Sequence, residues 1–286
     1  MGQWVHLNGE FVESSRAMVP ISDRGFLYGD GVFETTRVCQ RQIIGWKAHW
    51  ARFEAGLSLL RMDSRLSEPG ALKAANDLVQ RNNVSEGYVR WSATRGAGPR
   101  GYGIQGCGPG SFLIQAGSFP QPLPSAPRQW KLITSTWTLP LATPISRVKH
   151  SSKLLHVLAK AHAQESGADE PVLCNQDGWV VEAASANIAW IRDNCLFRPM
   201  DSAGALPGVF QEILAFEARR LGLGVETSQV TPMDLFKTEG VLLTLSTLGV
   251  VEATELDRQP LPLSPWTFRL WEACEKAMQA AAGRMG

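Results

Sequence analysis

Lys149 and Glu182 are the two residues of this sequence whose surroundings favour chemistry. Lys149 stands just before a segment with a helical pattern, capped by Ser151 or Ser152. Glu182 is the only formal charge in the apolar run 178–191. Because an unpaired buried carboxylate is neutralised or destabilises its surroundings, Glu182 needs a partner. The order of the two residues suggests a buried amine that works opposite a buried acid, although each residue alone is more often an ordinary surface charge.

Two glycine-rich loops precede or follow strand-like segments. In residues 22–31 the glycines let the backbone approach another group closely before the alternating run that ends at residue 38. The loop 95–103 carries Arg95 and Arg100, and two arginines on such a loop can clamp a carboxylate. Solvation of both arginines is the ordinary alternative.

A third anion site is expected where a helix begins. The Pro-Gly turn at residues 207–208 opens an amphipathic helix that runs to about residue 221. Its first amides, at Val209 and Phe210, have no partner within the helix, and such amides bind anions.

Composition excludes several classes of protein. With 28 Lys plus Arg against 27 Asp plus Glu, the net charge is +1, and no basic stripe indicates a nucleic-acid partner. No run of about 18 apolar residues and no signal-like N-terminus occur, so we expect a cytoplasmic protein with no membrane partner. The five scattered cysteines fit neither a disulfide framework nor a zinc site, and no metal is expected.

The elements that must position these residues are predicted from hydrophobic periodicity and turn residues. A hairpin is expected over 3–12 with Asn8-Gly9 as its turn. Further segments are helices at 49–61, 68–80 and 266–282, a short helix from Thr231-Pro232, and strands at 88–94, 111–116, 130–136, 225–230 and 241–251. Four prolines in 120–127 indicate a linker at 119–127, between an N-terminal domain (1–118) and a C-terminal domain (128–286).

Six motifs in this order resemble one family, the class IV, fold-type IV pyridoxal-phosphate enzymes. They are the run 29–34, His49-x-x-Arg52, the loop 95–102, Lys149, Glu182-x-x-x-x-Asn187 and the helix start after residues 206–208. The family contains branched-chain and D-amino-acid aminotransferases and aminodeoxychorismate lyase. The resemblance implies an α+β / α/β fold with a small N-terminal α/β domain and a larger, β-barrel-like C-terminal domain flanked by helices. It also implies a homodimer.

The same resemblance assigns roles around pyridoxal 5'-phosphate. By this resemblance Lys149 would bond covalently to the cofactor. Such a lysine needs an uncharged amine at neutral pH, which burial near other cations favours by lowering its pKa. Lys153 and Lys160 compete for this role, but both are expected inside the helix. Glu182 would pair with the pyridine nitrogen and keep the ring an electron sink. The phosphate would be held by Arg52, the amides of Val209 and Phe210, and the hydroxyls of Ser246 and Thr247. Many relatives have Thr where Phe210 stands, so here the amide must serve alone.

Within the family, the sequence favours the lyase. The segment Lys149-His150-x-x-Lys153-Leu154 and the loop 94–102 resemble those of aminodeoxychorismate lyase, and Thr35 occupies the position of its proposed catalytic hydroxyl. The lyase releases pyruvate from 4-amino-4-deoxychorismate and leaves 4-aminobenzoate. Leu154 stands where branched-chain aminotransferases have tyrosine. The candidate substrate-binding residues are Tyr28, Phe33, Arg100 and Tyr102.

Two alternatives stay open at this point. D-amino-acid aminotransferases also bind an α-carboxylate with an arginine at the position of Arg100, although they more often have Tyr where Phe33 stands. A catalytically idle cofactor-binding protein on the same fold is the third possibility, because fold alone does not fix function.

Overall fold

The structure, a computed structural model, describes residues 3–120 and 124–283 in two compact units. Unit 1 contains the described residues of Met1–Pro122, Val148–Lys153 and Met278–Gly286, and unit 2 contains those of Leu123–Arg147 and Leu154–Ala277. Residues 121–123 of the predicted linker lie outside the described residues. The segment that carries Lys149 therefore groups with the N-terminal unit.

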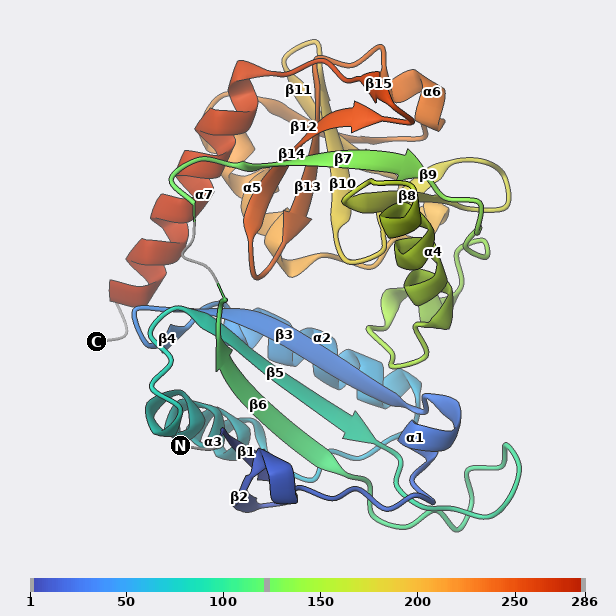
Figure 1. The fold of residues 1–286 in the computed structure, drawn as a ribbon, viewed down its shortest axis with the longest axis vertical. Coiled ribbons are helices and arrows are strands. Elements are labelled where there is room, and N and C mark those ends of the chain that lie inside the picture. Colours follow the sequence, from blue (N-terminus) through green and yellow to red (C-terminus); the bar gives the residue numbers. More distant parts are fainter. Residues whose placement is uncertain (1–2, 121–123, 284–286) are drawn as a thin grey trace. The chain divides into compact units, whose positions relative to one another are not determined.

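Unit 1 is built on an antiparallel sheet of six strands in the order β2-β1-β6-β5-β3-β4 (Figure 1). Its elements are β1 (Trp4–Leu7), β2 (Glu10–Glu13), η1 (Ser14–Arg16), α1 (Arg24–Tyr28), β3 (Gly31–Cys39), β4 (Gln42–Ile43), α2 (Trp46–Leu59), α3 (Glu68–Arg81), β5 (Gly87–Thr94) and β6 (Phe112–Ser118). Asn8 and Gly9, with φ of 54° and 104°, form the predicted turn between β1 and β2.

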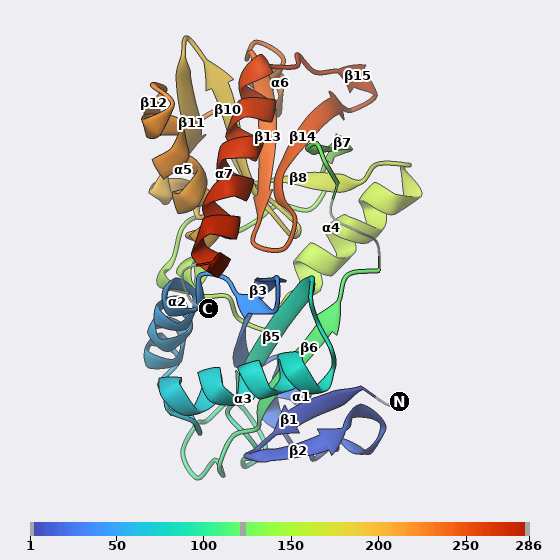
Figure 2. The same cartoon turned by 90° about the vertical axis from the view of Figure 1, so that its left-hand side faces the viewer.

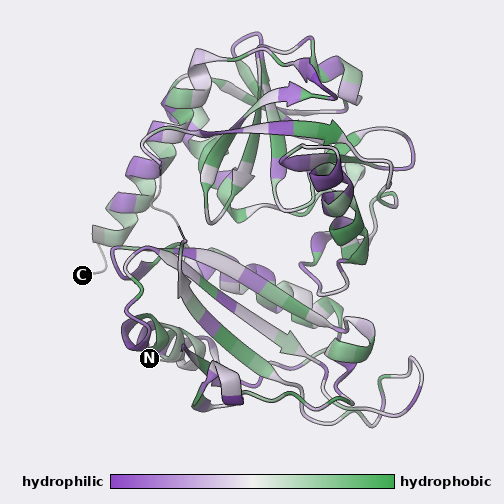
Figure 3. Ribbon diagram, viewed as in Figure 1, coloured by the Kyte–Doolittle hydropathy of each residue, from purple (hydrophilic) through white to green (hydrophobic). Residues whose placement is uncertain are grey.

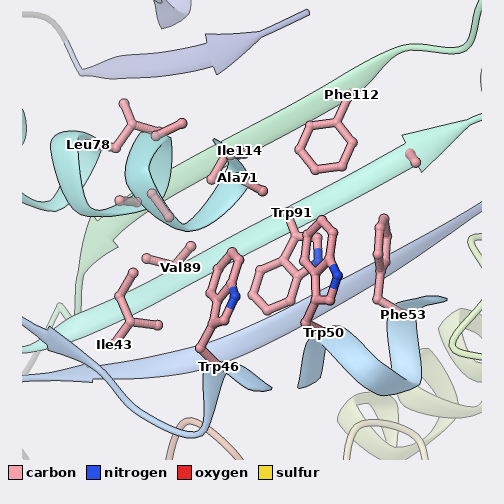
Figure 4. Close-up of a cluster of buried hydrophobic side chains, with 14 of the residues drawn as sticks. Ile43, Trp46, Trp50, Phe53, Ala71, Leu78, Val89, Trp91, Phe112 and Ile114 are labelled. Carbon is pink, nitrogen blue, oxygen red and sulfur yellow. The ribbon is translucent and has the colours of Figure 1, made fainter. Parts of the chain in front are cut away.

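The two faces of this sheet differ. Burial alternates along β5, so Val89, Trp91 and Ala93 point into the core while Arg90 and Ser92 point to the opposite face. Helices α2 and α3 pack on the core face (Figure 2). Figure 4 shows the aromatic rings that fill this layer, among them Trp46, Trp50, Phe53, Trp91 and Phe112.

Unit 2 is built on a mixed sheet of nine strands, ordered β12-β11-β10-β13-β14-β7-β8-β9 with β15 beside β14. Its elements are β7 (Arg128–Thr134), η2 (Pro144–Arg147), α4 (Leu154–Glu165), β8 (Glu170–Cys174), β9 (Val180–Ala183), β10 (Asn187–Arg192), β11 (Cys195–Pro199), η3 (Asp201–Ala203), α5 (Val209–Arg220), β12 (Gly224–Ser228), α6 (Pro232–Leu235), β13 (Gly240–Leu245), β14 (Gly249–Leu256), β15 (Gln259–Pro260) and α7 (Pro265–Gly283), whose residues from Met278 group with unit 1.

This second sheet curls. Strand β9, at one end of the order, also contacts β10 and β11, so the sheet forms a half-barrel around a core that includes Trp190 and Leu243. The strands β8, β10 and β13 are buried over most of their length, which is typical of strands covered on both faces. Figure 3 shows hydrophobic segments in green among the strands of unit 2.

Two sequence predictions about these elements were wrong. Helix α4 begins at Leu154, so neither Ser151 nor Ser152 caps it and Lys153 lies outside it. The reason is that the segment before α4 pairs with β3 as an extended chain. Phe33 N–H donates to Lys149 O (3.0 Å), and Ser151 N–H donates to Gly31 O (2.8 Å). These hydrogen bonds hold Lys149 five residues before the helix.

The predicted strand over 241–251 is two strands. β13 ends at Leu245 and β14 begins at Gly249, whose φ of 78° suits a turn. Ser246 and Thr247 therefore lie in the hairpin turn rather than at the end of a strand.

Among the residues that the structure describes, no helix is long and apolar enough to cross a membrane. The same part of the chain contains no group of three or more His, Cys, Asp or Glu side chains placed to hold a metal ion.

Candidate active site

The face of the unit 1 sheet opposite the core brings Lys149 together with two predicted site residues. Lys149 Nζ lies 4.9 Å from the centroid of the Phe33 ring. Two residues further along β3, Thr35 points to the same face. Lys149 is half-buried, and its backbone is fixed to β3 by the hydrogen bond from Phe33 N–H.

Arg90 is a residue of this face that the sequence analysis missed. Its Cζ lies 3.9 Å from the Phe33 centroid, and its Nη1 donates to Thr35 Oγ1 (3.4 Å). Burial lowers the pKa of the Arg90 guanidinium, and the charges of Tyr88 and Glu34 partly oppose that shift. The antiparallel register pairs Thr35 with Arg90 across two strands. Arg90 could not be assigned to the site from the sequence, because the sequence predicts the two strands but not the register in which they pair.

The core face of the same strand carries a buried cluster of charge. Arg52 Nε and Nη2 donate to the two oxygens of Glu34 (2.7 and 2.8 Å), and His49 Nδ1 lies 2.8 Å from Glu34 Oε2. Burial alone would raise the pKa of Glu34, but the hydrogen bonds and charges of Arg52 and His49 lower it to about 2. Burial lowers the pKa of His49. Arg52 is thus held in one orientation by a carboxylate of this chain.

The two arginines of the loop 95–103 are in different environments. Arg95 clamps the carboxylate of Asp30 through Nε (2.7 Å) and Nη2 (3.0 Å), while Arg24 Nε donates to the same group (3.0 Å). Burial alone would raise the pKa of Asp30, but the hydrogen bonds and charges of Arg95 and Arg24 outweigh it, so the pKa is lowered. The carboxylate clamped by Arg95 is therefore internal, whereas Arg100 lies exposed.

Tyr28 and Tyr102, two predicted substrate-binding residues, lie close to each other in unit 1. Their ring centroids are 5.5 Å apart, and the Tyr102 side chain is exposed. Gly29, which follows Tyr28, has φ of 67°, and a Cβ there would meet the Ser152 backbone at 2.9 Å. Gly29 is therefore needed in the motif 29–34 because the backbone of Ser152 approaches it closely.

In unit 2, Glu182 on β9 has the partner that its burial requires. His156 Nε2, on α4, lies 3.1 Å from Glu182 Oε1, and Leu206 N–H donates to Oε2 (3.0 Å). The sequence predicted that Glu182 needs a partner but did not identify His156. The signal was weak, because a histidine on a helical segment far along the chain has no motif that points to Glu182.

The start of α5 is tied to Glu182 through Leu206. Asn187 Nδ2 donates to Leu206 O (2.8 Å), so the backbone of Leu206 is held on both sides. A Cβ on Gly208 would lie 2.0 Å from Asn187 Oδ1, hence only glycine allows this approach. The N-cap of α5 is Gly208, which has no side chain to accept from the first amides of the helix, and the Phe210 side chain is buried while Val209 is half-buried.

Comparison with known proteins gives the family. The family model for amino-transferase class IV matches residues 31–256. The chain belongs to the class IV aminotransferase family. Its relatives include a protein named as a branched-chain-amino-acid aminotransferase from Methanocaldococcus jannaschii (29% identical, covering 88% of each chain). They also include an aminodeoxychorismate lyase from Bacillus subtilis (25%, 88% of this chain and 86% of the relative) and a D-alanine aminotransferase from Bacillus licheniformis (28%, 90% and 89%).

The fold of this class IV enzyme agrees with that of a solved structure. The branched-chain amino acid aminotransferase of Escherichia coli superposes with a TM-score of 0.90 at 21% identity, over 97% of this chain and 95% of that one. The predicted fold-type IV architecture is therefore confirmed, as is the prediction of an enzyme. Pyridoxal 5'-phosphate, the cofactor predicted from the motifs, is the cofactor of this family.

Residues of both units have the chemistry needed to bind the ring nitrogen and the phosphate of that cofactor. Glu182 is an enclosed carboxylate, 8% exposed, which suits a ring nitrogen that must stay protonated. The uncapped N-terminus of α5, a helix of 12 residues, suits a phosphate. Ser246 and Thr247 are half-buried in their turn, and Lys149 offers a half-buried amine. These observations fit the donor set that the cofactor needs.

Proposed function

We propose that this class IV enzyme is an aminodeoxychorismate lyase that converts 4-amino-4-deoxychorismate to 4-aminobenzoate and pyruvate. The observation that carries the proposal is the position of the Thr35 hydroxyl, on the sheet face where Phe33 contacts Lys149. A hydroxyl on the same face as an amine suits a reaction in which protons must be delivered while pyruvate leaves.

Each side chain of this face has a defined task in the proposal. The cofactor, when bound, supplies the electron sink that weakens bonds next to the substrate amine. Lys149 Nζ moves the proton, and Thr35 Oγ1 holds or delivers it toward the leaving group. Arg90 donates to Thr35 and offers a cation to a substrate carboxylate. Phe33 excludes water from the amine.

The phosphate and ring contacts come from the residues already described. Glu34 fixes the fork of Arg52 so that the guanidinium needs little further ordering when it binds a phosphate. The amides of Val209 and Phe210 and the hydroxyls of Ser246 and Thr247 are the further groups proposed to bind the phosphate. Because Phe210 is buried, its side chain takes no part.

We also propose that the enzyme is a homodimer. Unit 1 exposes large apolar side chains at Met18, Ile21, Phe26 and Leu27, which lie within ten residues of the chain, and at Tyr102. Exposed apolar surface of this kind is typical of protein interfaces. A second copy bound near this surface would bring the exposed Arg100 and Tyr102 side chains toward the substrate of that copy. Light scattering after gel filtration should report a dimer for the wild type and a shift toward monomer for Phe26→Glu. A monomeric wild type would contradict this part of the proposal.

The activity is tested by coupled detection of pyruvate from 4-amino-4-deoxychorismate, with 4-aminobenzoate measured by fluorescence. Thr35→Val should lower kcat by about 10²-fold because the hydroxyl proton is lost, and Thr35→Ser should restore most of it. Thr227→Val, at an exposed position of β12, is the matched control and should have no effect. Unchanged turnover in Thr35→Val would remove the argument for the lyase.

Transamination is the second candidate, because two of the three relatives above carry aminotransferase names. It predicts 2-oxo-acid-dependent conversion of D-alanine, D-glutamate or a branched-chain amino acid, with no pyruvate from 4-amino-4-deoxychorismate. In that reaction Arg90 or Arg100 would bind the α-carboxylate, and Thr35→Val would have little effect on turnover.

A further inference from the structure

One face of α4 carries His156 and Lys160, one helical turn apart, and both side chains reach residues around β9. His156 Nε2 lies 3.1 Å from Glu182 Oε1 on β9 itself. Lys160 pairs with Glu170, a fully buried residue at the start of β8.

Glu170 extends this contact to the turn after β9. Its Oε1 accepts from Ser185 N–H (2.6 Å) and from Ser185 Oγ (2.8 Å). The strand that carries Glu182 is therefore fixed by α4 at two points: at the carboxylate through His156, and at the following turn through Lys160 and Glu170.

The contact of His156 with Glu182 is made by one ring nitrogen. Nε2 lies 3.1 Å from Glu182 Oε1. The other nitrogen, Nδ1, is buried and makes no hydrogen bond to the residues that the structure describes. With a proton on Nε2, the ring donates a hydrogen bond to the carboxylate.

We propose that His156 is a positioning residue that keeps the proton of the Glu182–pyridine pair on the ring nitrogen of the cofactor. The inference rests on the proposed role of Glu182 and holds for either candidate reaction. A hydrogen bond to an ionised carboxylate stabilises the charged form and makes the group a weaker base. The proton shared with the pyridine nitrogen then stays on the ring. Without the Nε2–H donor, Glu182 becomes more basic and takes a larger share of that proton.

The test is the ¹⁵N NMR signal of the holoenzyme loaded with cofactor that carries ¹⁵N in its ring. We expect Glu182→Gln to move the signal to that of the neutral ring. His156→Leu should move it part of the way, with about a tenfold lower ratio of protonated to neutral ring. His156→Gln should stay near the wild type because its amide N–H reaches the place of Nε2, whereas the shorter side chain in His156→Asn should behave like leucine.

The controls separate this role from simple packing. His162→Gln changes a half-buried histidine of the same helix and should leave the signal unchanged. Near-UV circular dichroism checks the fold of each variant, and the contrast between Gln and Asn remains decisive if Leu does not fold. A shifted signal in Glu182→Gln with wild-type signals in both His156→Leu and His156→Asn would overturn the inference and leave the role of Glu182 intact. An unchanged signal in Glu182→Gln would overturn both.

Discussion

Glu34 and Glu182 are two buried strand carboxylates, each in contact with a histidine from a neighbouring helix. Glu34 lies on β3 with His49 of α2, and Glu182 lies on β9 with His156 of α4. The two carboxylates differ in a further group that donates to each of them. Glu34 accepts a guanidinium fork from Arg52, while Glu182 accepts the backbone amide of Leu206.

Glu34 orients a cation, Arg52, whereas Glu182 is itself held in place by the Leu206 amide. A full charge at hydrogen-bond distance in a buried site is far stronger than an amide dipole. The pKa of Glu34 is accordingly lowered to about 2. Removal of the Glu34 carboxylate takes a bidentate acceptor from the partly buried Arg52 guanidinium, whereas removal of the Glu182 carboxylate affects its hydrogen bonds with the His156 ring and the Leu206 amide. The two sites should therefore contribute differently to stability.

The largest effect is expected for Glu34→Gln. The change leaves Arg52 without its carboxylate and should lower the free energy of unfolding by about 3–5 kcal/mol. Urea denaturation of the cofactor-free protein, followed by tryptophan fluorescence, measures it. A loss below about 1 kcal/mol would show that the cluster is more hydrated than its burial indicates.

Acid should reduce the contribution of Glu34. Because the folded pKa of about 2 lies below the ordinary value of 4.5, the stabilisation is fully present above about pH 4.5 and is lost as the pH falls toward 2. The shift corresponds to a stabilisation on the order of 3 kcal/mol. Denaturation of wild type and Glu34→Gln at pH 7 and pH 3 should show the difference between them narrowing at the lower pH. A constant difference would contradict the low pKa.

A smaller effect on stability is expected for Glu182→Gln. The amide can still accept from Leu206 N–H, so the free energy of unfolding of the cofactor-free protein should fall by only about 1 kcal/mol. Turnover should fall much more, by about 10²-fold, because the ring nitrogen loses its anion. If stability fell as far as in Glu34→Gln, the comparison between the two carboxylates would fail.

The smallest effect is expected for the exposed pair Lys73–Asp77 on α3. Its atoms lie 2.7 Å apart, yet the Lys73 side chain is 78% exposed. Lys73→Ala should change the free energy of unfolding by less than about 0.5 kcal/mol. Together with the Glu34 result, this variant separates the effect of burial from the effect of distance.

Local elements were well predicted because their signals are local. The hairpin at Asn8-Gly9 and the capping box that starts α6 at Thr231 depend on residues within a few positions of each other. The start of α4 was misplaced because Lys149 and Ser151 pair with β3, more than a hundred residues earlier in the chain. Non-local pairing of this kind leaves no periodic signal.

The candidate site was predicted at the level of motifs rather than contacts. Motifs named Lys149, Glu182 and Arg52 as cofactor-binding residues, and these roles stay predictions. The expectation that Glu182 needs a partner agrees with its contacts to His156 and Leu206. The identities of His156 and Arg90 depended on helix placement and strand register, which a single sequence does not contain. The roles proposed for Thr35, Arg100, Ser246 and Thr247 stay predictions until the variants are measured.

The tryptophans in the core of unit 1 have an optical consequence. The ring centroids of Trp46 and Trp91 are 4.5 Å apart, and those of Trp46 and Trp50 are 5.6 Å apart (Figure 4). Indole transitions at such separations couple and give paired bands of opposite sign in circular dichroism. Trp190, in the core of unit 2, instead stacks on Phe197. The coupled bands should therefore give unit 1 a spectroscopic signal of its own, which disappears when its layer of rings separates.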